Sequence, residues 1–79
     1  MVARLKVGFV RVDRVETLGS VRVLVVKCDG DNYVDWLDSY TSAPNVVEFD
    51  GKTFGKTGWN SDTGSIYYRT DAMIARIVA

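Results

Sequence analysis

Turn-forming residues divide this chain into short segments rich in β-branched and aromatic side chains, and this constrains its fold more than any other feature. Turn chemistry occurs at Gly19-Ser20, at Asp50-Gly51 and over residues 60–64. Short strands separated by such turns are typical of all-β folds. We therefore expect one mainly β domain over residues 1–79, a small antiparallel β-meander or partly open barrel of five to six strands.

The first third of the chain predicts an opening hairpin. Apolar side chains alternate along residues 2–12, which indicates a strand. The alternation shifts near Val10, so we expect a bulge there or a strand buried on both faces. Residues 14–20 are expected to form the connection. Residues 21–28, with four consecutive apolar side chains, are expected to form a central strand.

The second half of the chain predicts a further meander. Three strands are expected, at residues 46–49, 52–59 and 65–69. Asp50-Gly51 predicts a tight hairpin turn between the first two. Gly55 and Gly58 indicate strong bending or a bulge in the second. Residues 72–78 are expected to form a closing strand, and a short helix capped by Thr70 or Asp71 is the alternative.

The segment near 32–40 has two interpretations. Its larger apolar side chains recur at helical spacing and its acids form an opposite stripe, which favours a short helix capped by Asp31 or Asn32. The same turn-flanked segment also fits a hairpin. The sequence leaves both open, and residues 41–45, which contain the only proline, are expected to form a loop.

Composition excludes several functional classes. The chain has no histidine and a single cysteine, Cys28, so neither an intramolecular disulfide nor a zinc site of the cysteine–histidine type can form. A net charge of zero argues against a general DNA-binding protein. The glycines of residues 51–55 lie too close together for a phosphate-binding loop. We expect no catalytic residues, no metal, no cofactor and no membrane segment, and a cytoplasmic protein.

The charges are strongly segregated along the chain. Residues 1–27 carry six basic and two acidic side chains, residues 28–50 carry six acidic and no basic ones, and residues 51–79 have a net charge of +2. Acids interleaved with aromatics can dock on a basic surface of another protein. We therefore predict a non-enzymatic protein-binding module whose partner-binding residues are Tyr33, Asp35, Trp36, Asp38 and Tyr40.

Two alternative functions remain open. Aromatic and basic residues beside the loop at 60–64 could form a stacking platform for single-stranded nucleic acid. The residues of this alternative nucleic-acid-binding set are Lys56, Trp59, Tyr68 and Arg69. The third hypothesis is a structural subunit or homo-oligomer assembled through an edge strand.

The stretch TGWNSDTGSIYYR at residues 57–69, together with the short length, resembles the small accessory proteins encoded by bacteriophages. The resemblance covers about a sixth of the chain and carries no motif with a known role. It implies a protein that acts in the host cytoplasm and binds and inhibits a host factor, as anti-CRISPR and other counter-defence proteins do. It assigns no role to any single residue.

Overall fold

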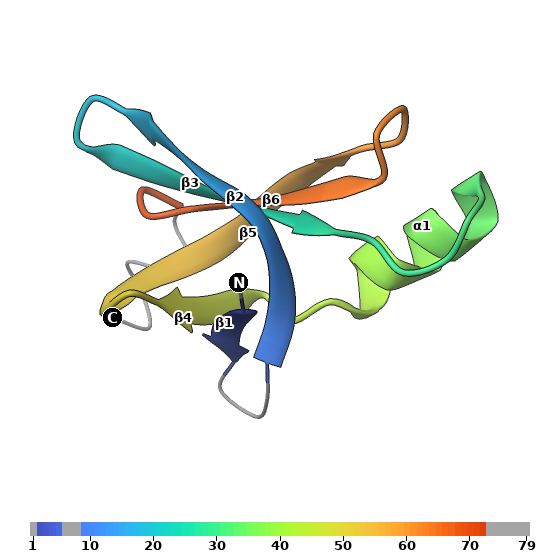
Figure 1. Ribbon diagram of the computed structural model, residues 1–79, viewed down its shortest axis with the longest axis horizontal. Coiled ribbons are helices and arrows are strands. Elements are labelled where there is room, and N and C mark those ends of the chain that lie inside the picture. Colours follow the sequence, from blue (N-terminus) through green and yellow to red (C-terminus); the bar gives the residue numbers. More distant parts are fainter. Residues whose placement is uncertain (1, 6–8, 73–79) are drawn as a thin grey trace.

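The described residues form one antiparallel sheet closed into a barrel, in which a helix connects two three-stranded meanders. The computed structural model describes residues 2–5 and 9–72 (Figure 1). The described elements are β1 (Val2–Leu5), β2 (Phe9–Leu18), β3 (Val21–Lys27), α1 (Tyr33–Ser42), β4 (Val46–Phe49), β5 (Lys52–Asn60) and β6 (Ser65–Arg69).

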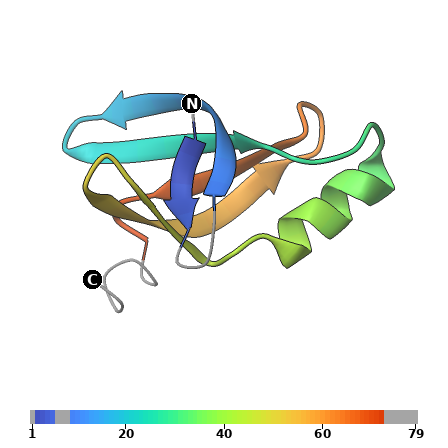
Figure 2. The ribbon, with the colours of Figure 1, turned by 60° about the horizontal axis from the view of Figure 1, so that its bottom comes forward.

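The strands form a barrel in the order β1-β2-β3-β6-β5-β4, with every neighbouring pair antiparallel. β3 and β6 join the two meanders through five residue pairs, from Val23↔Arg69 to Lys27↔Ser65. β1 and β4 close the barrel on the other side through Arg4↔Glu48 and Leu5↔Val47 alone. The two hairpins β2–β3 and β4–β5 splay apart at the end away from α1 (Figures 1 and 2). The expected mainly β barrel is confirmed.

The core follows from the central position of β3. Successive side chains on a strand point to opposite faces, so the consecutive burial of Val23 to Val26 means that β3 is covered on both faces. This confirms the central strand that the apolar run predicted. The inner side of the barrel is filled by Val12, Leu24, Val26, Val47, Phe54, Ile66 and Tyr68.

Left-handed backbone conformations occur where the turn residues predict them. Asp50 and Gly51 have φ angles of 52° and 74°, as a type I′ hairpin turn requires, and Gly19 has φ of 63° at the first position of the β2–β3 turn. The register of β5 shifts between Lys56 and Gly58, so the bulge expected from its glycines is present.

Three sequence predictions need correction. Residues 2–12 form parts of two strands, β1 and β2, and residues 14–18, expected as a connection, continue β2. β2 continues through residues 14–18 because its register shifts between Val12 and Arg14, and this bulge breaks the alternation while the strand goes on. The bulge lies beyond Val10, where a bulge or a strand buried on both faces was expected. Helix α1 also extends through Ser42 into the expected loop.

The ambiguous segment near 32–40 is helical. Asn32 has extended backbone angles and its side chain accepts a hydrogen bond from the backbone N–H of Asp35, which is the N-cap arrangement. The predicted closing strand at 72–78 lies outside the described residues, except for Ala72. Among the described residues, no helix has the length and apolar character needed to cross a membrane.

Tyr68 provides a test of the core. It is fully buried, and its hydroxyl donates a 2.8 Å hydrogen bond to the carbonyl of Pro44, which fixes the α1–β4 connection to the barrel. Burial, with a smaller contribution from Tyr40, raises the pKa of Tyr68 to about 12 from the ordinary 10.0. Because this pKa is higher in the folded state than in the unfolded state, the neutral phenol contributes stability. The contribution is fully present below pH 10 and is lost as the pH rises towards 12.

We expect Tyr68→Phe to lower the free energy of unfolding at pH 7 by about 1–2 kcal/mol, since the Pro44 carbonyl loses its donor. From pH 10 to 12 the wild type should lose about 2–3 kcal/mol that the variant does not lose. Urea unfolding at several pH values measures both effects. A constant difference between the two proteins over this range would contradict the buried neutral phenol.

Candidate functional site

Helix α1 lies beside one end of the barrel, next to β5 and the β5–β6 loop (Figures 1 and 2). None of its residues is fully buried. Of the four large hydrophobic side chains that are exposed among the described residues, three lie on this helix: Tyr33 is 56% exposed, Val34 65% and Leu37 38%. A helix with this much apolar surface in water is the most unusual surface feature of the described structure.

The inner side of α1 is attached to the barrel by Trp36. Its indole N–H donates a 3.0 Å hydrogen bond to the carbonyl of Gly30, in the loop before the helix. The ring packs on Gly64, in the loop just before β6, so closely that a Cβ atom on Gly64 would lie 2.8 Å from a ring carbon. Trp36 thus connects the loop before α1 with the β5–β6 loop, and its side chain is half-buried.

Trp59 of β5 forms the main contact between the barrel and the rest of the helix. Its ring stacks on that of Tyr40, with centroids 5.7 Å apart and planes inclined by 17°. The ring of Tyr33 lies on Trp59 in a tilted arrangement at 5.6 Å. Such aromatic pairs add stability beyond the area they bury, so Trp59 holds both ends of α1.

Lys56, on the same strand, completes the attachment. Its Nζ donates hydrogen bonds of 2.9 Å to the carbonyls of Tyr40 and Ala43, and lies 4.8 Å from the centroid of the Tyr40 ring. The last turn of α1 contains no basic residue. Lys56 therefore supplies from β5 the positive charge that stabilises a helix C-terminus. Desolvation by burial lowers the pKa of this lysine below its ordinary value.

The acids of α1 have different roles. The carboxylate of Asp35 accepts hydrogen bonds from the side chain of Asn32 and the backbone N–H of Asp31, so it belongs to the helix cap. Asp38 is exposed, and its carboxylate forms no hydrogen bond or ion pair with any described residue. Of the two acids on α1, Asp38 is therefore the one whose replacement leaves the described helix contacts unchanged.

The predicted partner-binding set is thus divided between two sides of α1. Trp36 and Tyr40 face the barrel, and Asp35 caps the helix. Tyr33 also contacts Trp59 of the barrel but remains 56% exposed, and Asp38 is exposed. The predicted partner-binding set lacked two exposed residues, Val34 and Leu37, although helical spacing could have identified them: Val34 lies four residues before Asp38, and Leu37 lies three residues after Val34. Val34, Leu37 and Asp38 are called here the α1 outer face, and the partly exposed Tyr33 borders it.

The alternative nucleic-acid-binding set does not form an exposed platform. Trp59 and Lys56 are covered by α1, and Tyr68 lies in the core. Tyr67, the neighbour of Tyr68 on β6, points to the opposite face of the strand and is only partly buried. Arg69 is paired with Asp71 through two hydrogen bonds of 2.9 and 3.0 Å.

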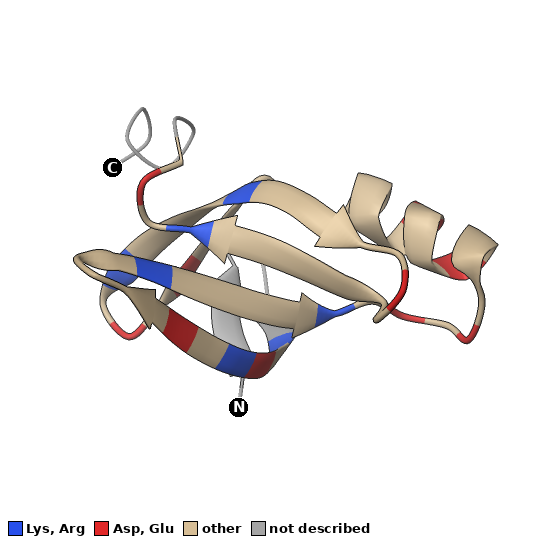
Figure 3. Cartoon of the chain, turned by 90° about the horizontal axis from the view of Figure 1, so that it is seen from above, with Lys and Arg blue, Asp and Glu red and all other residues tan. Residues whose placement is uncertain are grey.

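Acidic residues cluster along α1 and the loop before it (Figure 3). They are Asp29, Asp31, Asp35 and Asp38. The ion pairs of the described residues involve Asp13, Glu16 and Asp71, and none of these four acids. Glu48 and Asp50, from the same acidic stretch of the sequence, lie on β4 and the β4–β5 turn instead. The acidic surface is therefore smaller than the sequence suggests.

The contact between Trp36 and Gly64 can be tested by adding one methyl group. Gly64 and Gly19 both have positive φ angles, 65° and 63°, but a Cβ on Gly19 would meet nothing within 4 Å. Both alanine variants should lose about 1 kcal/mol to backbone strain. We expect Gly64→Ala to cost at least about 1 kcal/mol more, from overpacking against Trp36. Equal losses in chemical denaturation would contradict the contact.

The role of Lys56 is tested by Lys56→Met, which keeps most of the aliphatic chain. We expect a loss of about 1–2 kcal/mol in stability, because two helix carbonyls lose a charged donor. Amide hydrogen exchange should become faster in α1 while that of β3 changes little. Lys52→Met, at an exposed position of the same strand, is the matched control. Unchanged exchange in α1 would show that the lysine does not hold the helix.

Comparison with known proteins gave no match to a family model, to a curated protein or to a solved structure. The candidate site is therefore defined by the described geometry alone. That geometry consists of a helix held to the barrel by Trp36, Tyr40, Trp59 and Lys56, with an apolar and acidic outer face.

Proposed function

We propose that this protein is a non-enzymatic module that binds another protein through the α1 outer face, and that the partner offers an apolar cleft bordered by basic side chains. The observation that supports this most directly is the exposure of Tyr33, Val34 and Leu37 on one short helix beside acids without described ion-pair partners.

The apolar part of the face would supply affinity. An amphipathic helix commonly binds by placing residues at spacings of three and four into a groove, and Val34, Leu37 and Asp38 have that spacing. Their burial in a partner would remove apolar surface from water, which favours association. The helix is already held in place by the barrel, so little conformational entropy is lost on binding.

The acidic part of the face would supply specificity and speed of association. Four unneutralised carboxylates around one helix attract a basic surface and repel an acidic one. Basic surfaces often serve nucleic-acid binding, so inhibition of a host protein that handles nucleic acid is the finer form of this proposal, in agreement with the resemblance to phage accessory proteins. A cytoplasmic site of action suits the single free thiol of Cys28.

Two exposed acids permit a matched test. Asp38→Lys and Asp50→Lys change the net charge equally, but Asp50 lies in the β4–β5 turn, away from α1. Immobilised wild type and Asp50→Lys should capture the same protein from lysate of the source cell or its host. Asp38→Lys and Val34→Ser should weaken that capture by about tenfold or more, equivalent to 1.4 kcal/mol. The melting temperatures of these two variants should remain close to that of the wild type.

Salt titration separates the two contributions. Capture by the wild type should weaken as ionic strength rises, and capture by Asp38→Lys should depend less on salt. Equal capture by the wild type, Asp38→Lys and Val34→Ser, or no capture by any of them, would reject the α1 outer face as the binding surface.

A further inference from the structure

One edge of β2 has no described neighbouring strand along more than half of its length. On the side of β1 the pairing extends from Arg4↔Phe9 to Val2↔Arg11 and no further, although β2 continues to Leu18. On its other side β2 remains paired with β3 up to Leu18↔Val21. Beyond Arg11, no described strand pairs with β2 on its β1 side. An edge of this kind presents unpaired backbone groups to solvent.

The register of the hairpin shows which backbone groups face this edge. In a two-residue hairpin the residues that flank the turn, here Leu18 and Val21, form a hydrogen-bonded pair, and such pairs alternate along the ladder. Arg14 and Glu16 therefore bond towards β3. The N–H and C=O groups of Val15 and Thr17 point away from β3, towards the free edge.

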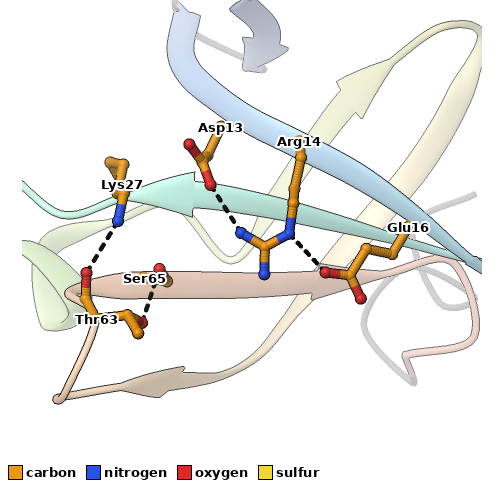
Figure 4. Close-up of polar contacts among 6 residues, drawn as sticks. All are labelled: Asp13, Arg14, Glu16, Lys27, Thr63 and Ser65. Atoms are coloured by element: carbon orange, nitrogen blue, oxygen red, sulfur yellow. Dashed lines mark hydrogen bonds and ion pairs between the residues drawn. The ribbon is translucent and has the colours of Figure 1, made fainter.

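The side chains along this edge form an ion-pair cluster (Figure 4). The guanidinium of Arg14 lies between two carboxylates, with its Nε 2.6 Å from Glu16 and its Nη1 2.8 Å from Asp13. These hydrogen bonds raise the pKa of Arg14, with Glu16 the largest cause. All three side chains are exposed and project from the outer side of the strand.

This segment is complementary to itself when two copies run antiparallel. A two-fold axis through Val15 places Arg14 opposite Glu16 of the second copy, and Glu16 opposite its Arg14. The same axis pairs Val15 with Val15, and Asp13 with Thr17, so the outward backbone groups of both edges meet. Opposite charges directly across a strand pair are stabilising.

Other registers are disfavoured by the same residues. A slip of two residues is the smallest that keeps outward backbone groups opposite one another. It would place Arg14 opposite Arg14, or Glu16 opposite Glu16, and like charges in these positions are destabilising. The charges therefore disfavour the two neighbouring registers, and the register centred on Val15 is the one in which opposite charges face each other.

We propose that two copies of this chain form a symmetric dimer by antiparallel pairing of β2 over residues 13–17, with Val15 on the two-fold axis. The β2–β3 turn and α1 lie at opposite ends of the molecule (Figure 1), so this pairing leaves the α1 outer face uncovered. The inference is independent of the proposed function: either can fail without the other.

Charge exchange tests the dimer with an internal control. In sedimentation equilibrium the wild type should associate reversibly to a dimer at concentrations up to about 1 mM, the weak affinity expected of a small interface. Arg14→Glu and Glu16→Arg should each weaken self-association by about tenfold or more, because the axis creates two like-charge pairs. An equimolar mixture of the two variants should form heterodimers, and the double variant should dimerise as the wild type does.

The backbone contribution is tested by Thr17→Pro. A proline removes an N–H, and an edge position whose N–H faces away from the neighbouring strand tolerates it. We expect the variant to keep the circular dichroism spectrum of the wild type and to lose dimerisation. A monomeric wild type at about 1 mM, single charge variants that associate like the wild type, or a Thr17→Pro variant that either unfolds or still dimerises would overturn the proposal.

Discussion

The pairing of β3 with β6 is the interaction on which the structure depends. The meanders β1–β2–β3 and β4–β5–β6 pair elsewhere only through β1 and β4, which meet over two residue pairs. β3 can occupy the central position since its four buried residues, Val23 to Val26, tolerate cover on both faces. Tyr68, opposite Leu24 in this ladder, then reaches across to the Pro44 carbonyl and fixes the start of the second meander.

The position of α1 depends in turn on β5. Lys56 and Trp59 lie on either side of the bulge in that strand, and both contact the helix. A strand side chain that bonds helix carbonyls and an aromatic ring that stacks on a helix tyrosine leave the opposite side of α1 to solvent. The exposed apolar surface is therefore a consequence of how the helix is held, and the helix is not loosely attached.

Local chemistry explains which features could be predicted from the sequence. Asp50-Gly51, the β-branched run of β3 and the two glycines of β5 each act through backbone preferences, and each appears in the structure as expected. The end of the first strand was wrong because a bulge at Asp13 breaks alternation without ending the strand. The site was predicted only in part: charge and aromatic content located α1, but the side of the helix that faces Trp59 depends on tertiary contacts that periodicity alone does not contain.

The barrel topology also has a consequence for how the chain folds. The β2–β3, β4–β5 and β5–β6 hairpins are local and can form early, because each needs only a short loop to close. The β3–β6 ladder joins residues about half the chain length apart, from Lys27↔Ser65 to Val23↔Arg69. Closing so long a loop costs entropy before the ladder compensates for it. We therefore expect the docking of the two preformed meanders to limit the folding rate, and folding to be slower than that of a helical bundle of equal length.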